Sequence, residues 1–399
     1  MLGLFAAAFA VRIAIHIGGM ENPLPDERDY TAIASSLANG QGYSAGADRI
    51  WPEYFRAPGI PYLLSGVSRL GLSWSVARWI LASANSLLAP ILFCIGLALA
   101  GRRDVALLLG LVGCLHPEHA RCSFEFVPDA LATTVAAGAI LAVVGQRSRD
   151  GDTTTNIWGG CLLGAAACLR SNMILLWLPV LGLWTWRAFY RPARRSSPAL
   201  FVGVAAILAT VLPAVALRSL DEGRILFLTD AGSEVFWRGN NEHTLDYLRG
   251  GPADVVADYK LVVGDRYGAP GAAGRAFAAG FEYIRRGPLE WLALKSTMLY
   301  DLWRPWPTFI PPPVATRLTG AALTCANVAK IGWVLLTDLL LVVVAVRACR
   351  IGRDEPALLL LAMVLVGTVF GVVCFPDHRY RMPIDIALAI LAVRGASLK

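Results

Sequence analysis

The sequence predicts an all-α polytopic membrane protein, a bundle of about ten transmembrane helices with a small extracytoplasmic cap. Only 16% of its 399 residues are charged and 56% are hydrophobic, whereas soluble domains carry about 25% charged residues. Apolar segments recur along the whole chain, and many approach the roughly 20 residues that one span needs. Arginines gather in the short loops between these segments, as in multi-pass membrane proteins. Composition and pattern therefore agree on the fold class.

About ten apolar segments are expected to form the bundle. They lie at 2–19, 76–100, 105–116, 124–145, 157–169, 172–187, 199–217, 326–346, 356–375 and 383–396. Two of them, 105–116 and 157–169, are short for a hydrocarbon core of about 30 Å, which favours tilted or partial spans. Because residues 1–19 lack a charged leader and a clear cleavage site, we interpret them as a retained first span rather than as a signal peptide.

Arginine clusters mark every second loop of this series, which places those loops and both termini in the cytoplasm. The clusters are Arg102 with Arg103, Arg147 with Arg149, Arg187 with Arg191, Arg194 and Arg195, and Arg347 with Arg350 and Arg353. The chain then forms one membrane domain, 1–399, with two long extracytoplasmic segments at 20–75 and 218–325. The net charge of +7 follows from this arrangement, and no RNP or zinc-finger motif indicates nucleic acid as a partner.

The eight cysteines lie mostly in or beside apolar segments, with no CxxC pair and no histidine at metal-ligand spacing. We expect them to be small apolar core residues. A disulfide among Cys122, Cys325 and Cys374, which share one face of the membrane in this topology, remains an open alternative. The scattered histidines give no support to a metal site on the outer face.

The first extracytoplasmic segment begins with four charged residues at 26–29. Apolar residues at i, i+3, i+4 and i+7 from Tyr30 predict a short amphipathic helix along the membrane surface. Asp29 fits the N-cap of that helix, whereas Asp26 stands outside it and is less well explained by capping. A carboxylate in a partly buried, water-lined site can act as a general base for a hydroxyl. The guanidinium group of Arg56 can bind a phosphate through two charge-assisted hydrogen bonds.

A second acidic pair, Glu125 and Asp129, stands at the start of the apolar segment 124–145, about one helical turn apart. Pro128 predicts that a helix begins near Asp129. The two carboxylates are either favourable charges at a helix N-terminus or acids that face the same outer cavity as Asp26. Both interpretations remain open on this evidence.

Three extracytoplasmic turns carry arginines that the positive-inside rule does not explain. They contain Arg170, the pair Arg379 and Arg381, and Arg304. Snorkelling explains one such arginine, but the three turns together favour an anionic partner such as a lipid phosphate.

Two stretches of the second outer segment have simpler interpretations. Residues 276–303 are apolar at helical spacing and predict one surface helix before a proline-rich turn. In 237–241, asparagines beside a glycine are typical of a tight turn.

Taken together, these residues resemble the lipid-dependent glycosyltransferases of the GT-C superfamily. The likeness is greatest to the bacterial family 39 group, which includes protein O-mannosyltransferases and the aminoarabinose transferases of lipid A. The motifs follow the order of the family. They are Asp26-Glu27-x-x-Tyr30, residues 38–43, residues 56–61, the acidic start of a span at Asp129, residues 164–170 and residues 379–383.

The resemblance implies a GT-C-type bundle that transfers a sugar from a polyprenyl-phosphate donor, with inversion, to a hydroxyl of a lipid, glycan or protein. The site would face the extracytoplasmic side of a bacterial cytoplasmic membrane. No cofactor is required in this scheme, although some related enzymes use a divalent metal. The sequence identifies neither the sugar nor the acceptor.

The resemblance also implies roles for individual residues. Asp26 would be the general base, and Asp129 would orient the acceptor or the base. The donor phosphate would be bound by Arg56, Arg170, Arg379 and Arg381. Possible substrate-binding residues are Glu27, Tyr30, Tyr43, Glu125, Trp237, Asn240 and Tyr380. Candidates for the aromatic walls of the pocket are Tyr43, Trp51, Tyr54, Phe55 and Trp237.

The alternative from another class is a transporter or flippase of lipid-linked sugars. Transporters place charges near the bilayer midplane on broken helices and often contain inverted repeats. In this sequence the charges gather at one surface and no repeat is visible, which favours the enzyme. A non-catalytic scaffold would leave the outer arginines beside carboxylates unexplained.

Overall fold

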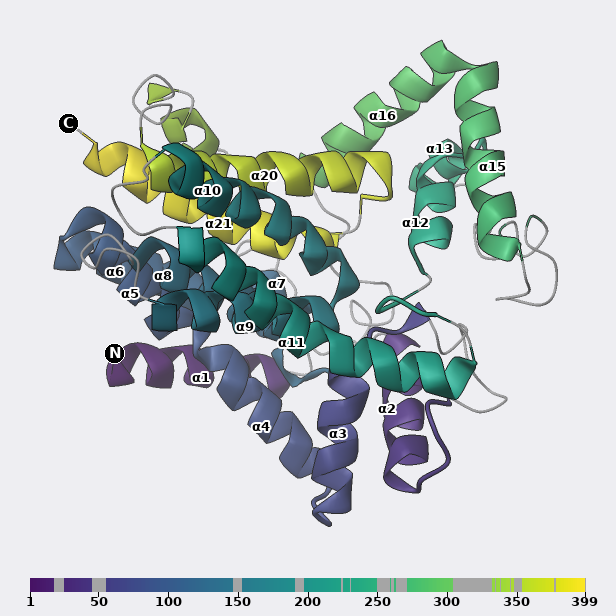
Figure 1. Cartoon of the computed structure of the whole chain (residues 1–399). Helices are drawn as coiled ribbons and strands as arrows, with labels where there is room; N and C mark the ends of the chain where they lie inside the picture. Colours follow the sequence, from purple (N-terminus) through teal and green to yellow (C-terminus); the bar gives the residue numbers. More distant parts are fainter. Residues whose placement is uncertain are drawn as a thin grey trace.

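The computed structural model is helical, and its described residues contain no strand (Figure 1). The structure describes residues 1–17, 25–44, 55–145, 153–190, 197–223, 225–229, 231–249, 259, 262, 271–303, 332–333, 335–337, 339–344, 346–347, 354–376 and 378–398. Of the predicted span 326–346, residues 326–331, 334, 338 and 345 fall outside these ranges. Trp51, Tyr54, Arg304 and Cys325 also lie outside them.

The bundle consists of long apolar helices that share one core. They are α1 (Leu2–Ile17), α4 (Trp74–Ser86), α5 (Leu88–Ala100), α6 (Arg103–Leu115), α8 (Asp129–Val144), α9 (Thr153–Leu169), α10 (Trp177–Tyr190), α11 (Ser197–Glu222), α20 (Glu355–Val373) and α21 (His378–Ser397). Leucine, isoleucine, valine and alanine side chains of α5, α8, α20 and α21 supply most of the main buried cluster. Close van der Waals packing of these apolar side chains holds the helices together.

Three helical segments are long and apolar enough to cross a membrane, within the part of the chain that the structure describes. They are Trp74–Ala100, Leu200–Leu220 and Glu355–Val373, and the bent pair Pro117–Phe124 with Asp129–Val144 would be a fourth. The chain is therefore a multi-pass helical membrane protein. The predicted number of about ten spans is not confirmed, because helices such as α6 and α9 have only 13 and 17 residues.

Glycines allow α9 and α11 to approach each other closely. At Gly160 a β-carbon would collide with the carbonyl oxygen of Gly203, and at Gly164 it would press on the carbonyl of Ile207. Small residues at helix contacts are the usual solution in membranes, where van der Waals packing replaces the hydrophobic effect between helices.

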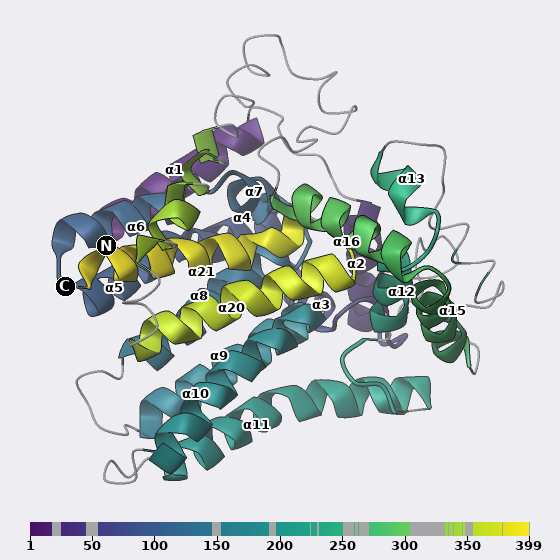
Figure 2. The same ribbon diagram turned by 90° about the horizontal axis from the view of Figure 1, so that it is seen from above.

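The outer helices gather at the end of the bundle away from both chain termini (Figures 1 and 2). They are α2 (Pro25–Ala38), α3 (Gly59–Arg69), α12 (Ala231–Gly239), α13 (Thr244–Leu248), α15 (Ala272–Arg286) and α16 (Pro288–Trp303). Three further short helices connect helices of the bundle: α7 (Pro117–Arg121) and the 3₁₀ helices η2 (Cys122–Phe124) and η4 (Ser171–Leu176). We refer to the cluster of α2, α3, α12, α13, α15 and α16 as the cap.

The prediction that Asp29 caps a helix starting at Tyr30 was wrong. Helix α2 begins at Pro25, so Asp26 and Asp29 both lie in its first turns. Proline favours the first position of a helix because its fixed φ suits the helix and its missing N–H is not needed there. The Asp29 carboxylate accepts hydrogen bonds from Arg56.

The predicted single surface helix at 276–303 is two helices, α15 and α16, which are separated at Gly287. The break follows from Pro288, which cannot donate the backbone hydrogen bond that a continuous helix requires. The predicted helix start near Asp129 is confirmed, because α8 begins at that residue after Pro128.

A charged residue inside the first apolar helix holds α1 against its neighbours. Arg12 is fully buried, and its guanidinium donates to Ser123 Oγ at 3.0 Å and to the backbone oxygen of Asn85 at 3.3 Å. It also lies 2.8 Å from Nδ1 of His119. Several hydrogen bonds compensate the cost of burying this charge, so its role is structural.

Two polar side chains attach the cap to α20. Lys295 of α16 donates to the backbone oxygens of Gly239 and Val373, at 2.6 and 3.3 Å. Asn240 donates to Phe236 and Val373 oxygens at 2.7 and 2.8 Å, and it accepts a hydrogen bond from the Trp291 indole at 2.8 Å. These bonds satisfy carbonyls at the ends of α12 and α20 and fix the position of α12.

Candidate functional site

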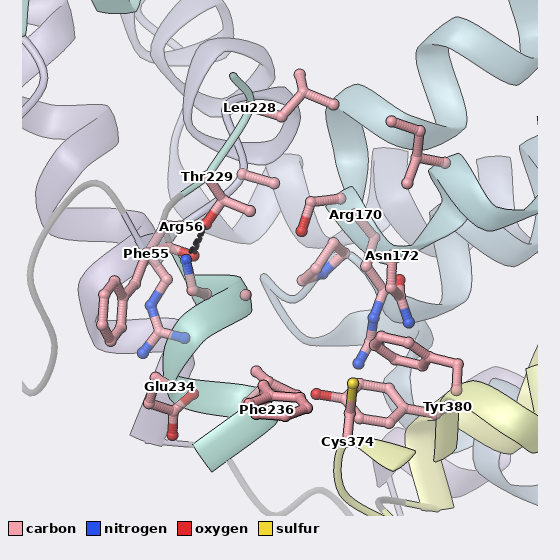
Figure 3. Close-up of a pocket in the computed structure, with 18 of the residues that line it drawn as sticks. Phe55, Arg56, Arg170, Asn172, Leu228, Thr229, Glu234, Phe236, Cys374 and Tyr380 are labelled. Atoms are coloured by element: carbon pink, nitrogen blue, oxygen red, sulfur yellow. Dashed lines mark hydrogen bonds between the residues drawn. The ribbon is translucent and has the colours of Figure 1, made fainter. Parts of the chain in front are cut away.

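A pocket of about 480 Å³ opens between the cap and the outer ends of α8, α20 and α21. Its walls come from distant parts of the chain: the start of α2, the turn before α3, the segment 170–175, residues 227–229, α12 and the start of α21. Figure 3 shows Phe55, Arg56 and Glu234 on one side of this pocket and Arg170, Asn172 and Tyr380 on the other.

The Asp26 carboxylate joins two arginines of the pocket. Its Oδ1 accepts from Arg56 Nη2 at 3.0 Å, and its Oδ2 accepts from Arg379 Nη1 at 2.9 Å. Asp26 and Arg379 are 353 positions apart in the sequence. The side chain of Asp26 is 22% exposed, so the carboxylate remains accessible from the pocket.

Arg56 is held rigidly by carboxylates and an aromatic ring. Besides Asp26, it donates to Asp29 Oδ2 from Nη2 at 2.6 Å and from Nε at 3.1 Å. Its guanidinium carbon lies 5.4 Å from the centre of the Tyr30 ring. Burial acts to lower the pKa of Arg56, but the Asp26 and Asp29 charges outweigh it, so the pKa lies above its usual value of 12.5.

A second ion pair lines the opposite wall. Arg170 contacts the buried carboxylate of Asp129, and its guanidinium carbon lies 4.7 Å from the centre of the Tyr380 ring. Asp129 stands at the first position of α8, where the helix dipole also favours a negative charge. The pocket therefore combines carboxylates and guanidinium groups that remain accessible to a ligand.

The structure brings together just over half of the residues that the sequence singled out. Those that line the pocket are Asp26, Tyr30, Arg56, Asp129, Arg170, Arg379 and Tyr380. They come from motifs that were predicted to share one membrane face.

Two predicted charged residues have other partners. Arg381 lies on the buried side of α21, where it donates to Asp385 at 2.8 Å and to the Leu302 oxygen at 3.3 Å. Glu27 forms an ion pair with Arg78 and accepts from the Phe126 amide at 3.4 Å. Glu27 does not line the pocket.

Four further candidates are structural parts of the surroundings. Tyr43 donates to the Arg56 backbone oxygen at 3.0 Å, and Glu125 pairs with Arg121 at 3.0 Å. Trp237 packs on Tyr259 with ring centres 5.5 Å apart. Asn240 makes the cap contacts described above. None of these four side chains lines the pocket.

The aromatic walls differ from those predicted. Of the predicted set, Phe55 lines the pocket, whereas Trp51 and Tyr54 lie outside the described residues. The remaining phenylalanines of the lining are Phe227, Phe236, Phe277 and Phe370. They belong to segments without a motif, so only the folded chain could identify them.

Sequence reasoning also missed Glu234 and Arg238. They stand four residues apart on α12, and Arg238 Nη1 lies 3.2 Å from Glu234 Oε1. Both side chains line the pocket. Their spacing is a signal for an ion pair on one helix face, but the sequence had predicted a turn at 237–241 and not this helix.

Cys374 lines the pocket (Figure 3). Cys122 and Cys374 are free thiols, which removes the disulfide alternative between these two. Among the residues that the structure describes, no group of three or more His, Cys, Asp or Glu side chains could hold a metal ion.

No family model and no curated protein matches the chain. Among solved structures, the chain is similar to that of ArnT from Cupriavidus metallidurans bound to undecaprenyl phosphate, with 16% sequence identity and a TM-score of 0.45. The aligned region covers 99% of this chain and 77% of that chain.

Proposed function

We propose that this protein is a glycosyltransferase that moves a sugar from a polyprenyl-phosphate donor to an acceptor hydroxyl on the extracytoplasmic face of the membrane. The contact of Asp26 with Arg56 and Arg379 is the observation that carries the proposal. Asp26 supplies a base for the acceptor, and the guanidinium groups of Arg56 and Arg379 beside it can bind a phosphate. All three line the pocket next to the cap.

In the proposed reaction, the donor phosphate competes with Asp26 for the two arginines. Guanidinium groups bind phosphate oxygens through paired, charge-assisted hydrogen bonds. When the phosphate occupies Arg56 and Arg379, the Asp26 carboxylate is released toward the acceptor. Donor binding therefore frees Asp26 to act as the base, and we expect the donor to bind before the acceptor.

The transfer itself is a single displacement with inversion. The acceptor oxygen attacks the anomeric carbon of the sugar while its proton passes to Asp26. The bond between this carbon and the phosphate oxygen breaks, and the electron pair leaves with the lipid phosphate. Arg56 and Arg379 stabilise the charge that develops on the leaving group. Asp129 holds Arg170 beside Tyr380 and so maintains the opposite wall.

Comparison of envelope glycans tests this function. We expect a strain that lacks the protein to lose one sugar modification from its glycolipids or envelope glycans, as detected by mass spectrometry. Wild-type protein should restore the modification, whereas Asp26→Asn should not, at equal amounts of protein in the membrane. Full restoration by Asp26→Asn would contradict the assignment of the base.

The same strain separates the enzyme from a flippase. Loss of a transferase leaves the unused lipid-linked sugar in the outer leaflet, while loss of a flippase leaves it in the inner leaflet. Accumulation confined to the inner leaflet would therefore contradict the proposed transfer reaction.

A further inference from the structure

Glu234 is a pocket carboxyl group that the proposed reaction leaves without a role. Its side chain is only 5% exposed, and it lines the pocket from the cap helix α12. Figure 3 shows it on the same side of the pocket as Arg56. Glu234 therefore lies next to the arginine that the proposal assigns to the donor phosphate.

The surroundings of Glu234 differ from those of Asp26. Each oxygen of Asp26 accepts from a guanidinium, at 3.0 and 2.9 Å. Glu234 has an ion-pair contact of 3.2 Å with Arg238, and the other charged groups acting on it are Arg56, which attracts it, and Asp26, which repels it. Burial raises the pKa of Glu234 above its usual 4.5, although Arg238 and Arg56 oppose this shift.

Among the residues that the structure describes, the charges that line the pocket or lie directly behind Arg56 balance before any ligand enters. Four arginines, Arg56, Arg170, Arg238 and Arg379, line the walls, and four carboxyl groups accompany them: Asp26, Asp129 and Glu234 in the walls and Asp29 behind Arg56. A phosphodiester adds one negative charge to this neutral set. A like charge nearby disfavours an ionised carboxylate, most of all one that is buried from water. Glu234 is 5% exposed, whereas Asp26 is 22% exposed and remains solvated when the phosphate takes its arginines.

We propose that Glu234 is a second functional carboxyl group of the pocket, one that takes up a proton from solvent when the lipid phosphodiester binds and then donates a hydrogen bond to the ligand. This inference rests on the proposed function, since it takes the anion to be the donor phosphate. The protonated Glu234 keeps the pocket neutral, while Asp26 stays ionised as the base. The two carboxyl groups have different environments and therefore different proton affinities. Glu234 can then act as the proton donor while Asp26 acts as the proton acceptor.

Calorimetric titration with farnesyl methyl phosphodiester tests the inference. This probe keeps one negative charge between pH 5 and 9, so its own ionisation does not contribute. Titrations in two buffers with different ionisation enthalpies measure the number of protons taken up. We expect the wild-type protein to take up a substantial fraction of one proton at a pH above the pKa of Glu234, and Glu234→Gln to take up none.

The affinity should follow the same pattern. Since a single proton is linked to binding, the wild-type Kd should rise with pH by at most about tenfold per unit. The Kd of Glu234→Gln should change little with pH. Glu282→Gln is a matched control, because Glu282 pairs with Arg285 and Arg286 on the exposed face of α15 and does not line the pocket. It should retain the wild-type proton uptake.

Each outcome has a definite meaning. Binding without proton uptake by the wild-type protein would overturn the role of Glu234 and leave the proposed function intact, and this measurement needs no variant to fold. Uptake that persists in Glu234→Gln would also overturn it, because another group would carry the proton. If the wild-type protein does not bind the probe at any pH, both the inference and the proposed function fail.

Discussion

At the scale of single residues, the pocket depends on a few ion pairs between segments that are remote in sequence. Asp26, Arg56 and Arg379 were predicted to meet because the pattern of spans places their motifs on one membrane face. Glu234 was not predicted, since a carboxylate in a segment without a motif looks like any solvated surface charge. Its burial depends on the cap helices closing over the pocket.

Arg56→Ala should weaken binding of undecaprenyl phosphate about 10- to 100-fold, because charge-assisted hydrogen bonds contribute about 1.5–3 kcal/mol. Affinity can be measured by titration of purified protein in detergent. Arg102→Ala is a suitable control, since Arg102 is exposed and pairs with Asp104. Unchanged affinity of Arg56→Ala would contradict its role in phosphate binding.

Tyr380→Leu should reduce transfer more than it reduces stability. The ring lies beside the Arg170 guanidinium and lines the pocket, so its loss should leave Arg170 less well oriented. We expect about a two- to fivefold loss of turnover, consistent with about 0.5–1 kcal/mol for a cation–π contact. Phe370→Leu is the control: it also replaces an aromatic side chain of the lining with leucine, and it tests whether such a loss reduces turnover at any lining position.

At the scale of elements, helix starts marked by proline were partly predictable. Pro128 correctly predicted the start of α8, whereas the start of α2 was placed too late, because Pro25 was treated as part of a turn. The break between α15 and α16 was missed, since apolar periodicity continues through Gly287 and Pro288. Periodicity identifies faces of helices but does not show where the backbone hydrogen bonds stop.

Lys295→Met should loosen the cap. The change removes the donor that satisfies the backbone oxygens of Gly239 and Val373, and a buried acceptor without its partner costs about 1–3 kcal/mol. We expect a lower thermal midpoint in detergent together with reduced transfer, because α12 carries part of the pocket wall. Lys295→Arg should recover part of the stability; a midpoint for Lys295→Met equal to that of the wild type would contradict the anchoring role.

At the scale of the whole molecule, the sequence predicted a helical membrane bundle, and the structure has this organisation. The number of spans could not be predicted as well, because short apolar helices such as α6 are equally compatible with full or partial crossing. The two termini lie at the same end of the molecule, away from the cap (Figures 1 and 2), and their location in the cytoplasm stays a prediction.

The orientation can be tested with cysteine labels in whole cells. A membrane-impermeant maleimide should label Glu242→Cys in the cap, in a background without other exposed cysteines, because this position is exposed. Asp104→Cys, at an exposed position in the first turn of α6, should react only after the cells are opened. The reverse pattern would place the pocket on the cytoplasmic side.

The central claim is that Asp26 occupies the phosphate-binding arginines until the donor releases it. The most direct measurement compares undecaprenyl phosphate binding and sugar transfer in wild-type protein and Asp26→Asn. Because the amide removes a charged competitor for Arg56 and Arg379, the variant should bind the lipid at least as tightly as the wild type, by up to about tenfold, while transfer is abolished. A variant that loses lipid binding, or one that still transfers the sugar, would contradict the account.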